Sequence, residues 1–432
     1  MIFCRSSESA SSCRRFGLSI HNLRSIEVAV RFKELENLMY VNVAVLKETQ
    51  QHERRVALVP SVAAKLMKLG AKLHMEPGAG ASISMDDGAF ENVVFITDLT
   101  ALVKDADVVL SVQPPAIEVI NAMKEGAILV SFIYAQNEPA LLKCLLERKI
   151  TCFAMERVPR ITRAQAMDAL SSQSALAGYF AVQLGATHLA RVIPKITSAA
   201  GSIGPAHVLV MGLGVAGLEA IATAHRLGAV VEGYDVRPET QEQALSLGAT
   251  FVDTGIDARG EGGYARELSV EEQAKVAEIL TKHIQSADLV ITTAAIPGKA
   301  SPKLISHAQV AGMKNGAVIV DLSAEGGGNC DDTKPGETTK IGRVSIVAPL
   351  NIPSLLAEDA SELYAKNQFN LLALFVKNNI VEIDWNDEIL AKTVLTHAGQ
   401  NKAEQCDRTQ KTTLPVKPPA KAKHSKHAST KA

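Results

Sequence analysis

The sequence predicts an α/β protein with two lobes, each built on a doubly wound parallel β-sheet. Short apolar runs alternate with helical patterns in two successive series along the chain. Aromatic residues make up only 4% of the 432 residues, and small and branched aliphatic residues fill most apolar positions. This composition is expected where helices cover a parallel sheet.

The first series starts with the apolar run VNVAVLKE at residues 41–48, which is typical of a buried strand. A helix is predicted over residues 60–70, because Pro60 stands near its start and Gly70 at its end. Further strand-like runs then alternate with helical ones as far as residue 156. This βαβ rhythm predicts parallel strands joined by covering helices.

A long helical stretch, roughly residues 172–191, separates the two series. We expect the strand-like run RVSIVAPLNIP, which begins at Arg343, and a helix near 357–377 to return to the first lobe. The predicted domains are therefore a first lobe of residues 39–175 plus 345–399 and a second lobe of residues 176–344.

Both ends of the chain differ from these lobes in composition. Residues 1–38 are rich in Arg and Ser, which leaves a poorly ordered extension, a transit peptide or a mis-assigned start. Four glutamates in this segment fit poorly with the acid-poor composition of transit peptides. Residues 400–432 carry lysines separated by Pro and Ala, which predicts a disordered basic tail, either solvated or weakly attracted to an anionic surface.

Charge and cysteine usage exclude several classes of protein. The formal net charge of −1 argues against nucleic-acid binding through bulk charge. The six cysteines show no CxxC spacing and no paired His cluster, which favours reduced thiols and predicts no metal site. Gly, Pro or charged residues interrupt every long apolar run, so no membrane-spanning segment is predicted.

The strongest local motif is GLGVAG at residues 212–217, which follows an apolar strand pattern and opens a helix pattern. Gly212 permits a tight turn, Gly214 lets the backbone approach a pyrophosphate, and Gly217 allows close packing of helix on strand. The N-terminus of the helix supplies free N–H groups for the phosphates. The motif predicts a dinucleotide site, and with it two Rossmann-like lobes separated by a nucleotide-binding cleft.

Asp235 ends the next strand pattern, AVVEGYD. A carboxylate at this position accepts hydrogen bonds from the adenosine ribose hydroxyls and repels a 2′-phosphate. Asp235 therefore favours NAD over NADP, although the nearby Arg237 weakens that preference.

Two later loops of the second series contain polar groups. Asp321 and Glu325 follow a strand pattern, and we interpret them as hydrogen-bonded loop carboxylates rather than acid–base groups. The stretch GEGGYARE at residues 260–267 is either a mobile flap carrying Tyr264 or a plain surface loop.

The loop RITRAQAMDALSSQ at residues 160–173 contains Arg, Gln and Asp but no His, Cys, Lys or Tyr. It offers groups that position a ligand without a group that transfers protons near neutral pH. Asp168 also stands where it would cap a helix that begins near Ala169.

Five segments together resemble the NAD(H)-binding domain of proton-translocating nicotinamide nucleotide transhydrogenases, and more narrowly the alpha-1 subunits of the bacterial split enzymes. The segments are VAVLKETQQHERRVALVP, VPRITRAQAMDALSSQSALAGY, MGLGVAGLEAIATAHRLGA, TTAAIPGKASPKLI and VIVDLSAEGGGNC. The similarity runs from about residue 41 to about residue 399. It implies a Si–Re specific enzyme that passes a hydride from NADH to NADP⁺ as protons cross a membrane.

The resemblance implies that Arg160, Gln165 and Asp168 form the hydride-transfer site and orient the nicotinamide end of NAD(H). Direct hydride transfer moves no proton at the reacting carbons, so positioning groups suffice and no metal is needed. Together with Asp168, the residues implied to contact NAD(H) are Ala166, Met167, Ala169, Gly212, Gly214, Val215, Gly217, Asp235, Val236, Arg237, Gly263 and Tyr264.

The resemblance also implies partners. A beta subunit would supply the membrane domain and the NADP(H) domain, together with a small second alpha chain. This chain would form a homodimer held at the cytoplasmic face of the inner membrane through those subunits.

Two other interpretations remain. Alanine dehydrogenases share the opening motif and the nucleotide-binding core, but the family places Lys and His near the substrate, where this chain has Ser111, Gln113 and Tyr134. An NAD-binding sensor without catalytic activity is the other alternative. The loop at 160–168 disfavours a sensor, which does not need to present the nicotinamide outward.

Overall fold

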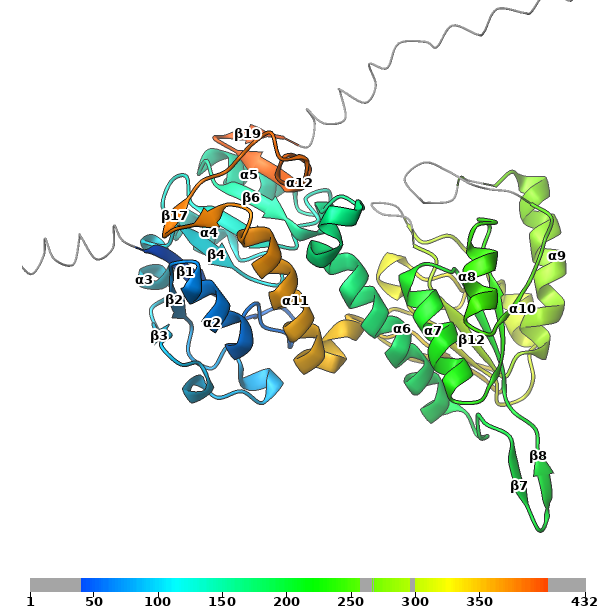
Figure 1. Cartoon of the computed structure of the whole chain (residues 1–432). Helices are drawn as coiled ribbons and strands as arrows, with labels where there is room; N and C mark the ends of the chain where they lie inside the picture. The colour runs from blue at the N-terminus through cyan, green and yellow to red at the C-terminus, as the bar shows by residue number, and fades with distance from the viewer. Residues whose placement is uncertain (1–39, 257–265, 267, 296–299, 403–432) are drawn as a thin grey trace, which may run out of the picture.

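The computed structural model describes residues 40–256, 266, 268–295 and 300–402. Two α/β lobes lie next to each other, and helices α6 and α11 lie at the junction between them (Figure 1). The extension expected at residues 1–38 lies outside the described residues, as does the expected basic tail from residue 403 onward.

The first lobe is built on an eight-stranded sheet in the order β19-β18-β6-β5-β4-β1-β2-β3. Strands β1 to β6 run parallel, whereas β18 runs antiparallel to β6 and β19 antiparallel to β18. The strands are β1 (Val41–Val45), β2 (Ala71–Met75), β3 (Val94–Phe95), β4 (Val108–Leu110), β5 (Ile128–Ser131), β6 (Thr151–Ala154), β18 (Val394–His397) and β19 (Gln400–Asn401).

Helices cover both faces of this sheet. Successive residues of β1 point to opposite faces, so Val43 and Val45 join one apolar cluster and Ala44 joins the other. The first cluster contains residues of α2 and α11, and the second contains residues of α3, α4 and α5. The helices are α2 (Pro60–Lys68), α3 (Leu99–Lys104), α4 (Ile117–Ala122), α5 (Pro139–Glu147), α11 (Ala357–Leu372) and α12 (Glu388–Thr393), with the short 3₁₀ helices η2 (Ala81–Ile83), η3 (Asp87–Ala89) and η4 (Met155–Arg157).

The second lobe contains a seven-stranded sheet in the order β11-β10-β9-β12-β13-β15-β14. All neighbouring strands are parallel except β14, which is antiparallel to β15. Its first six strands have the order of a dinucleotide-binding Rossmann sheet. The strands are β9 (His207–Met211), β10 (Val230–Tyr234), β11 (Thr250–Phe251), β12 (Leu289–Thr292), β13 (Val318–Asp321), β14 (Thr338–Ile341) and β15 (Val344–Val347).

Helices again lie on both faces of the second sheet, where α6 and α7 contribute to one apolar cluster and α9 and α10 to the other. The α/β class and the two Rossmann-like lobes predicted from the sequence are therefore confirmed. The helices are α7 (Val215–Arg226), α8 (Thr240–Ser246), α9 (Val270–Ser286) and α10 (His307–Ala311), with the 3₁₀ helix η7 (Ala324–Gly326).

Helix α6 (Ala169–His188) links the lobes. Its N-terminal half packs on α11, where the Gln173 side chain donates to the carbonyl oxygen of Ala360 at 3.1 Å. Further along, α6 meets α7 so closely that a Cβ atom on Gly178 would clash with the carbonyl oxygen of Ala216. The 3₁₀ helices η5 (Thr162–Met167) and η8 (Ile352–Leu356) lie next to α6 and α11.

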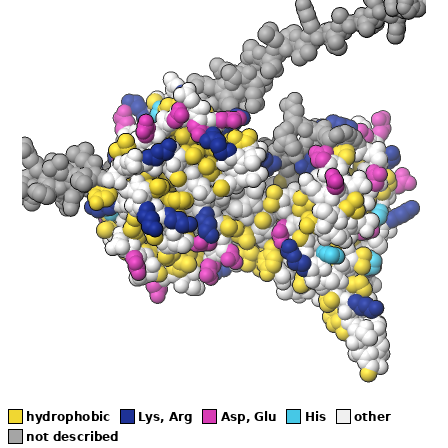
Figure 2. Space-filling model, in the orientation of Figure 1, with side chains coloured by type: hydrophobic (Ala, Val, Ile, Leu, Met, Phe, Trp, Pro, Cys, Tyr) yellow, Lys and Arg dark blue, Asp and Glu magenta, His cyan; other side chains and the backbone are white. Residues whose placement is uncertain are grey.

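A two-stranded hairpin of β7 (Ile196–Ser198) and β8 (Gly201–Ile203) projects from the second lobe (Figure 1). The side chains of Ile196 and Ile203 are 42% and 54% exposed. On the face shown in Figure 2, the hairpin displays apolar and uncharged atoms, while acidic and basic side chains are interspersed over both lobes. A second small hairpin of β16 (Val376–Lys377) and β17 (Ile380–Val381) lies beside the first sheet.

Two predicted boundaries are wrong. Strand β15 pairs with β13 and β14, so it belongs to the second sheet, although we expected residues from 345 onward to return to the first lobe. The return comes later, with α11, α12 and β18. Gln400 and Asn401 form β19 against β18 rather than the start of a disordered tail.

Candidate functional site

The glycine loop at 212–217 has the geometry of a phosphate-binding turn. Gly212 has φ +95°, a left-handed conformation that favours glycine. A Cβ atom on Gly217 would clash with the carbonyl oxygen of Gly212, so only glycine permits this close packing. A Cβ atom on Gly214 would meet no atom within 4 Å, so space is open at the N-terminus of α7, where the N–H groups favour an anion. Val215 is the first residue of α7 and is 44% exposed.

Asp235 joins the glycine loop to the end of β10. Its Oδ2 accepts hydrogen bonds from the Leu213 backbone N–H at 2.7 Å and from Arg237 Nη2 at 2.8 Å. Its Oδ1 accepts from the backbone N–H and from Nε of Arg237, each at 2.9 Å. The Asp235 side chain is only 6% exposed, and Val236 beside it is half-buried. Arg237 thus neutralises the carboxylate rather than pointing away from it.

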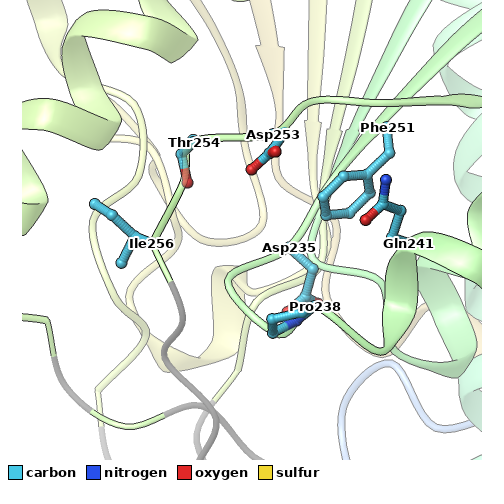
Figure 3. A pocket seen from close by; sticks show the side chains of 7 residues that line it. All are labelled: Asp235, Pro238, Gln241, Phe251, Asp253, Thr254 and Ile256. Atoms are coloured by element: carbon cyan, nitrogen blue, oxygen red, sulfur yellow. The ribbon is translucent and has the colours of Figure 1, made fainter.

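A pocket lies next to Asp235, at the carboxyl ends of β10 and β11 (Figure 3). Asp253 and Thr254 come from the segment that follows β11, and Gln241 comes from the first turn of α8. Its lining side chains are Asp235, Pro238, Gln241, Phe251, Asp253, Thr254 and Ile256. Sequence reasoning did not identify this pocket beyond Asp235. The available signal was Asp253, which follows the strand-like ATFV much as Asp235 follows its own strand.

The loop predicted for hydride transfer folds as η5 and leads directly into α6. Gln165 and Ala166 are exposed, and Met167 and Ala169 are buried. Asp168 caps α6, because its Oδ1 accepts from the Ser171 backbone N–H at 2.9 Å and its Oδ2 accepts from the Ser171 hydroxyl at 2.6 Å.

Side chains of the first lobe hold this loop in place. The carbonyl oxygen of Ala166 accepts hydrogen bonds from the amide groups of Asn367 and Asn370, each at 2.9 Å. Arg163 donates two hydrogen bonds to the carboxylate of Asp387, at 2.7 and 2.8 Å. Arg160, on the same loop, is exposed at the surface. The loop is therefore anchored at several points while Gln165 stays accessible.

Helix α6 sets the distance between the loop and the glycine turn. Gly178 of α6 touches the backbone of Ala216, which lies within the glycine motif. Asp168 precedes Gly178 by ten residues, which corresponds to about 15 Å along an α-helix. The two predicted halves of the site thus belong to different lobes but are joined by one rigid element. Gly263 and Tyr264, also predicted to contact the nucleotide, lie outside the described residues.

The carboxylates of Asp321 and Glu325 are both hydrogen-bonded in their loop. Asp321 is fully buried, and its oxygens accept from backbone N–H groups including that of Asn329 at 2.7 Å and from hydroxyls including that of Thr333 at 2.6 Å. Glu325 Oε1 accepts from the backbone N–H of Asn351 at 2.8 Å. This geometry agrees with the interpretation of both as loop carboxylates.

A buried ion pair that sequence reasoning missed lies where the lobes meet. Arg55 Nη2 and Glu53 Oε2 are 2.6 Å apart, and their side chains are 4% and 1% exposed. Gln173 of α6 accepts from Arg55 Nη1 at 2.8 Å, while Asn351 Nδ2 and Ser354 Oγ donate to the Glu53 carboxylate at 3.0 and 3.1 Å. Burial alone would raise the pKa of Glu53, but the hydrogen bonds and charge of Arg55 outweigh it and lower that pKa to about 2.

The positions where alanine dehydrogenases place Lys and His surround this ion pair. Gln113 donates to Glu53 Oε2 at 2.9 Å, and the Ser111 side chain is buried. Burial, together with the charge of Glu156, raises the pKa of Tyr134 well above its usual range. Burial also raises the pKa of the neighbouring Glu48 to about 7, although its carboxylate accepts from the backbone N–H groups of Val112 and Gln113.

Comparison with known proteins assigns the family. Residues 44–177 match the family model described as "Alanine dehydrogenase/PNT, N-terminal domain", and residues 181–404 match "Alanine dehydrogenase/PNT, C-terminal domain". The chain belongs to the alanine dehydrogenase/PNT family. It is 43% identical over 374 residues to the first of the chains that form the NAD(P) transhydrogenase alpha subunit of Rhodospirillum rubrum, a match that covers 83% of this chain and 97% of that protein.

A solved structure of the transhydrogenase from Sinorhizobium meliloti matches with a TM-score of 0.73 and 38% identity, over 83% of this chain and 98% of that one. The alanine dehydrogenase of Mycobacterium tuberculosis is 31% identical over 300 residues, which cover 68% of this chain and 76% of that protein. Both transhydrogenase matches have higher identity and coverage, which confirms the predicted resemblance to transhydrogenase alpha subunits.

The described residues contain neither a membrane-spanning helix nor a metal cluster. In residues 40–402, apart from the gaps noted above, no helix is both long and apolar enough to cross a lipid bilayer. The same stretch of the chain has no group of three or more His, Cys, Asp and Glu side chains that could hold a metal ion.

Proposed function

We propose that this chain binds NAD(H) and presents the nicotinamide of NADH for direct hydride transfer to NADP⁺ on a partner subunit, coupled to proton translocation across a membrane. The observation that supports this most strongly is the link made by α6. The helix starts at the exposed loop 160–168 and packs against the glycine turn that would hold the phosphates. One ligand could therefore contact both ends of that arrangement.

The residues divide the work of holding the nucleotide. The N–H groups at the start of α7 face the open space beside Gly214 and would hold the pyrophosphate. Asp235 would accept from the ribose hydroxyls, and because Arg237 already occupies both of its oxygens, we expect the Arg237 side chain to move aside when NAD(H) binds. A carboxylate at this position favours NAD(H) over NADP(H).

The nicotinamide end requires orientation rather than proton transfer. Bound NADH supplies the hydride, and no proton moves at the reacting carbons. We propose that Arg160, Gln165 and Asp168 hold the ring and its carboxamide, with Gln165 reaching toward the partner's nucleotide. Asp168 can do this while it caps α6, because an ionised carboxylate has about four acceptor positions.

The alternative of amino-acid oxidation needs a proton-transferring group beside the substrate. At the corresponding positions, Gln113 is engaged with Glu53, Ser111 is buried, and Tyr134 has a raised pKa that keeps its hydroxyl protonated at neutral pH. These contacts disfavour an alanine dehydrogenase.

We further propose the assembly that goes with this function. A beta subunit would provide the NADP(H) domain and the membrane domain, with a small second alpha chain beside it. The exposed apolar side chains of Ile196 and Ile203 on the β7–β8 hairpin offer a surface for a homodimer. The complex would place this chain at the cytoplasmic face of the inner membrane.

Reconstitution tests the proposal. The purified chain is mixed with the NADP(H)-binding domain of a transhydrogenase, and reduction of thio-NADP⁺ by NADH is followed by absorbance. We expect transfer that needs both proteins and no oxidation of alanine. Tight binding of NADH without any transfer would contradict the proposal, and turnover of alanine would instead support the dehydrogenase.

A further inference from the structure

The order of strands in the second sheet matches the order of groups along a dinucleotide. Strands β9, β10 and β11 are neighbours, about 4.8 Å apart. The glycine loop follows β9, Asp235 follows β10, and the segment with Asp253 follows β11. A ligand with its pyrophosphate at the glycine loop and its ribose at Asp235 would therefore place its base over the end of β11.

We infer that the pocket around Asp253 recognises the adenine base, and that the Asp253 carboxylate accepts a hydrogen bond from the exocyclic amino group of adenine. This inference rests on the proposed function, because it takes NAD(H) as the ligand. It assigns Asp253 a role in selecting the base, distinct from that of Asp235 at the ribose.

The two aspartates occupy matching positions on neighbouring strands but differ in their bonding. Gly233 pairs with Phe251, and Val252 N donates to the carbonyl oxygen of Gly233 at 2.9 Å, so the register continues toward Asp235 and Asp253. All the strong acceptor positions of Asp235 are filled by Leu213 and Arg237.

Asp253, by contrast, has acceptor capacity to spare. Its Oδ1 accepts one hydrogen bond, from the backbone N–H of Gly255 at 2.8 Å. Within the described stretches of the chain, its Oδ2 accepts none. The residue is exposed, so the carboxylate keeps its charge and remains accessible to a ligand.

The rest of the pocket suits a flat aromatic base. Pro238, Phe251 and Ile256 supply apolar surface, and Phe251 and Ile256 are half-buried. In the view of Figure 3, Phe251 and Gln241 lie on one side of the hollow, Ile256 and Thr254 on the other, and Asp253 between them. An apolar enclosure with a few fixed polar groups is the usual form of a small-molecule site.

The chemistry of a carboxylate determines which base it selects. An ionised carboxylate only accepts hydrogen bonds, and the adenine edge offers an amino donor at the 6-position. Hypoxanthine has a carbonyl oxygen there instead, which would face the carboxylate with like negative charge. Asp253 should therefore favour NADH over the analogue with hypoxanthine in place of adenine.

The test compares the dissociation constants of NADH and reduced nicotinamide hypoxanthine dinucleotide, measured by the fluorescence of the dihydronicotinamide. We expect the chain to bind NADH roughly tenfold more tightly, since one charge-assisted hydrogen bond is gained and one repulsion avoided at an exposed site. In Asp253→Asn the side-chain amide can either donate or accept, so this preference should fall to near unity. Asp105→Asn, an exposed change in the first lobe, should keep the preference.

Each other outcome overturns the adenine assignment. Equal binding of the two nucleotides by the unmodified chain would contradict it, as would a preference that survives in Asp253→Asn or an equal loss of affinity for both. These results leave NADH binding intact, so they do not affect the proposed function. Failure to bind NADH at all would contradict both.

Discussion

At the scale of single residues, the loop at 160–168 separates anchoring from presentation. Arg163 and the carbonyl oxygen of Ala166 tie the loop to the first lobe. Gln165 is exposed, and its side chain makes no hydrogen bond to any described residue. A side chain with this freedom on a fixed loop is suited to contact a second nucleotide.

Gln165→Asn tests that role. The change keeps the amide but withdraws it by one methylene, so the orientation of the nicotinamide suffers more than binding of the whole nucleotide. Hydride transfer should slow by about 100-fold, the effect of a small misplacement at a reacting centre, while NADH affinity stays nearly constant. Single-turnover transfer and fluorescence titration measure the two quantities. Equal losses in both would mean that the residue is only structural, and Gln243→Asn on the exposed face of α8 is the matched control.

Glu48 predicts a pH dependence of stability. Its pKa in the folded chain is raised from 4.5 to about 7, mainly by burial. The folded state thus binds this proton more tightly than the unfolded state, and the stabilisation is fully present below pH 4.5 and is lost as the pH rises to about 7. Glu48→Gln should flatten this part of the curve of unfolding free energy against pH. Denaturant unfolding at several pH values measures it, with the exposed Glu91→Gln as control. An unchanged slope in Glu48→Gln would contradict the assignment.

At the scale of elements, alternation of apolar runs was enough to predict most strands, the covering helices and the glycine turn. These features depend on residues close together in the chain. Strand β15 was assigned to the wrong sheet because its apolar alternation does not specify a neighbour, and its pairing with β13 is made across more than twenty residues. The same reason explains the boundary near residue 400.

The site divides in the same way. The glycine motif and Asp235 were predictable because strand, turn and helix are consecutive. The ion pair of Glu53 with Arg55 was not, because its partners Gln173 and Asn351 lie more than one hundred residues away. Asp253 was missed because only the parallel pairing of β10 with β11 places it beside Asp235.

Gly178→Ala tests the close contact of α6 with α7. The added methyl group would clash with the backbone of Ala216, which cannot move without shifting the glycine turn. We expect a loss of roughly 1–3 kcal/mol in unfolding free energy, as for other overpacked sites, together with weaker NADH binding. In the control Gly185→Ala, the new methyl meets only the side chain of Leu289, so the loss should be smaller. Unfolding and nucleotide titration decide, and unchanged NADH binding in Gly178→Ala would contradict the coupling.

At the scale of the whole molecule, the buried polar cluster holds the lobes in one arrangement. Arg55 and Glu53 belong to the first lobe, and Asn351 bonds both of them while its backbone N–H donates to Glu325 of the second lobe. Gln173 adds the start of α6 to the same cluster. The relative position of the glycine turn and the loop at 160–168 therefore depends on these contacts as well as on α6.

Arg55→Met tests the cluster. It leaves the Glu53 carboxylate buried without its partner, which should lower the unfolding free energy by about 3–5 kcal/mol. The double change Glu53→Gln with Arg55→Met removes that unpaired charge and should recover some of the loss. Denaturant unfolding of the three proteins measures the coupling. If the double variant is as unstable as the sum of the two single changes, the ion pair does not act as a unit.

The proposed function depends above all on direct passage of the hydride from NADH on this chain to NADP⁺ on a partner. The most direct measurement uses NADH labelled with deuterium on the transferred position, mixed in ordinary water with this chain, NADP⁺ and the NADP(H)-binding domain of a transhydrogenase. If transfer is direct, the NADPH formed carries the deuterium at C4 of its nicotinamide. Product without deuterium, with the label lost to water, would contradict direct transfer.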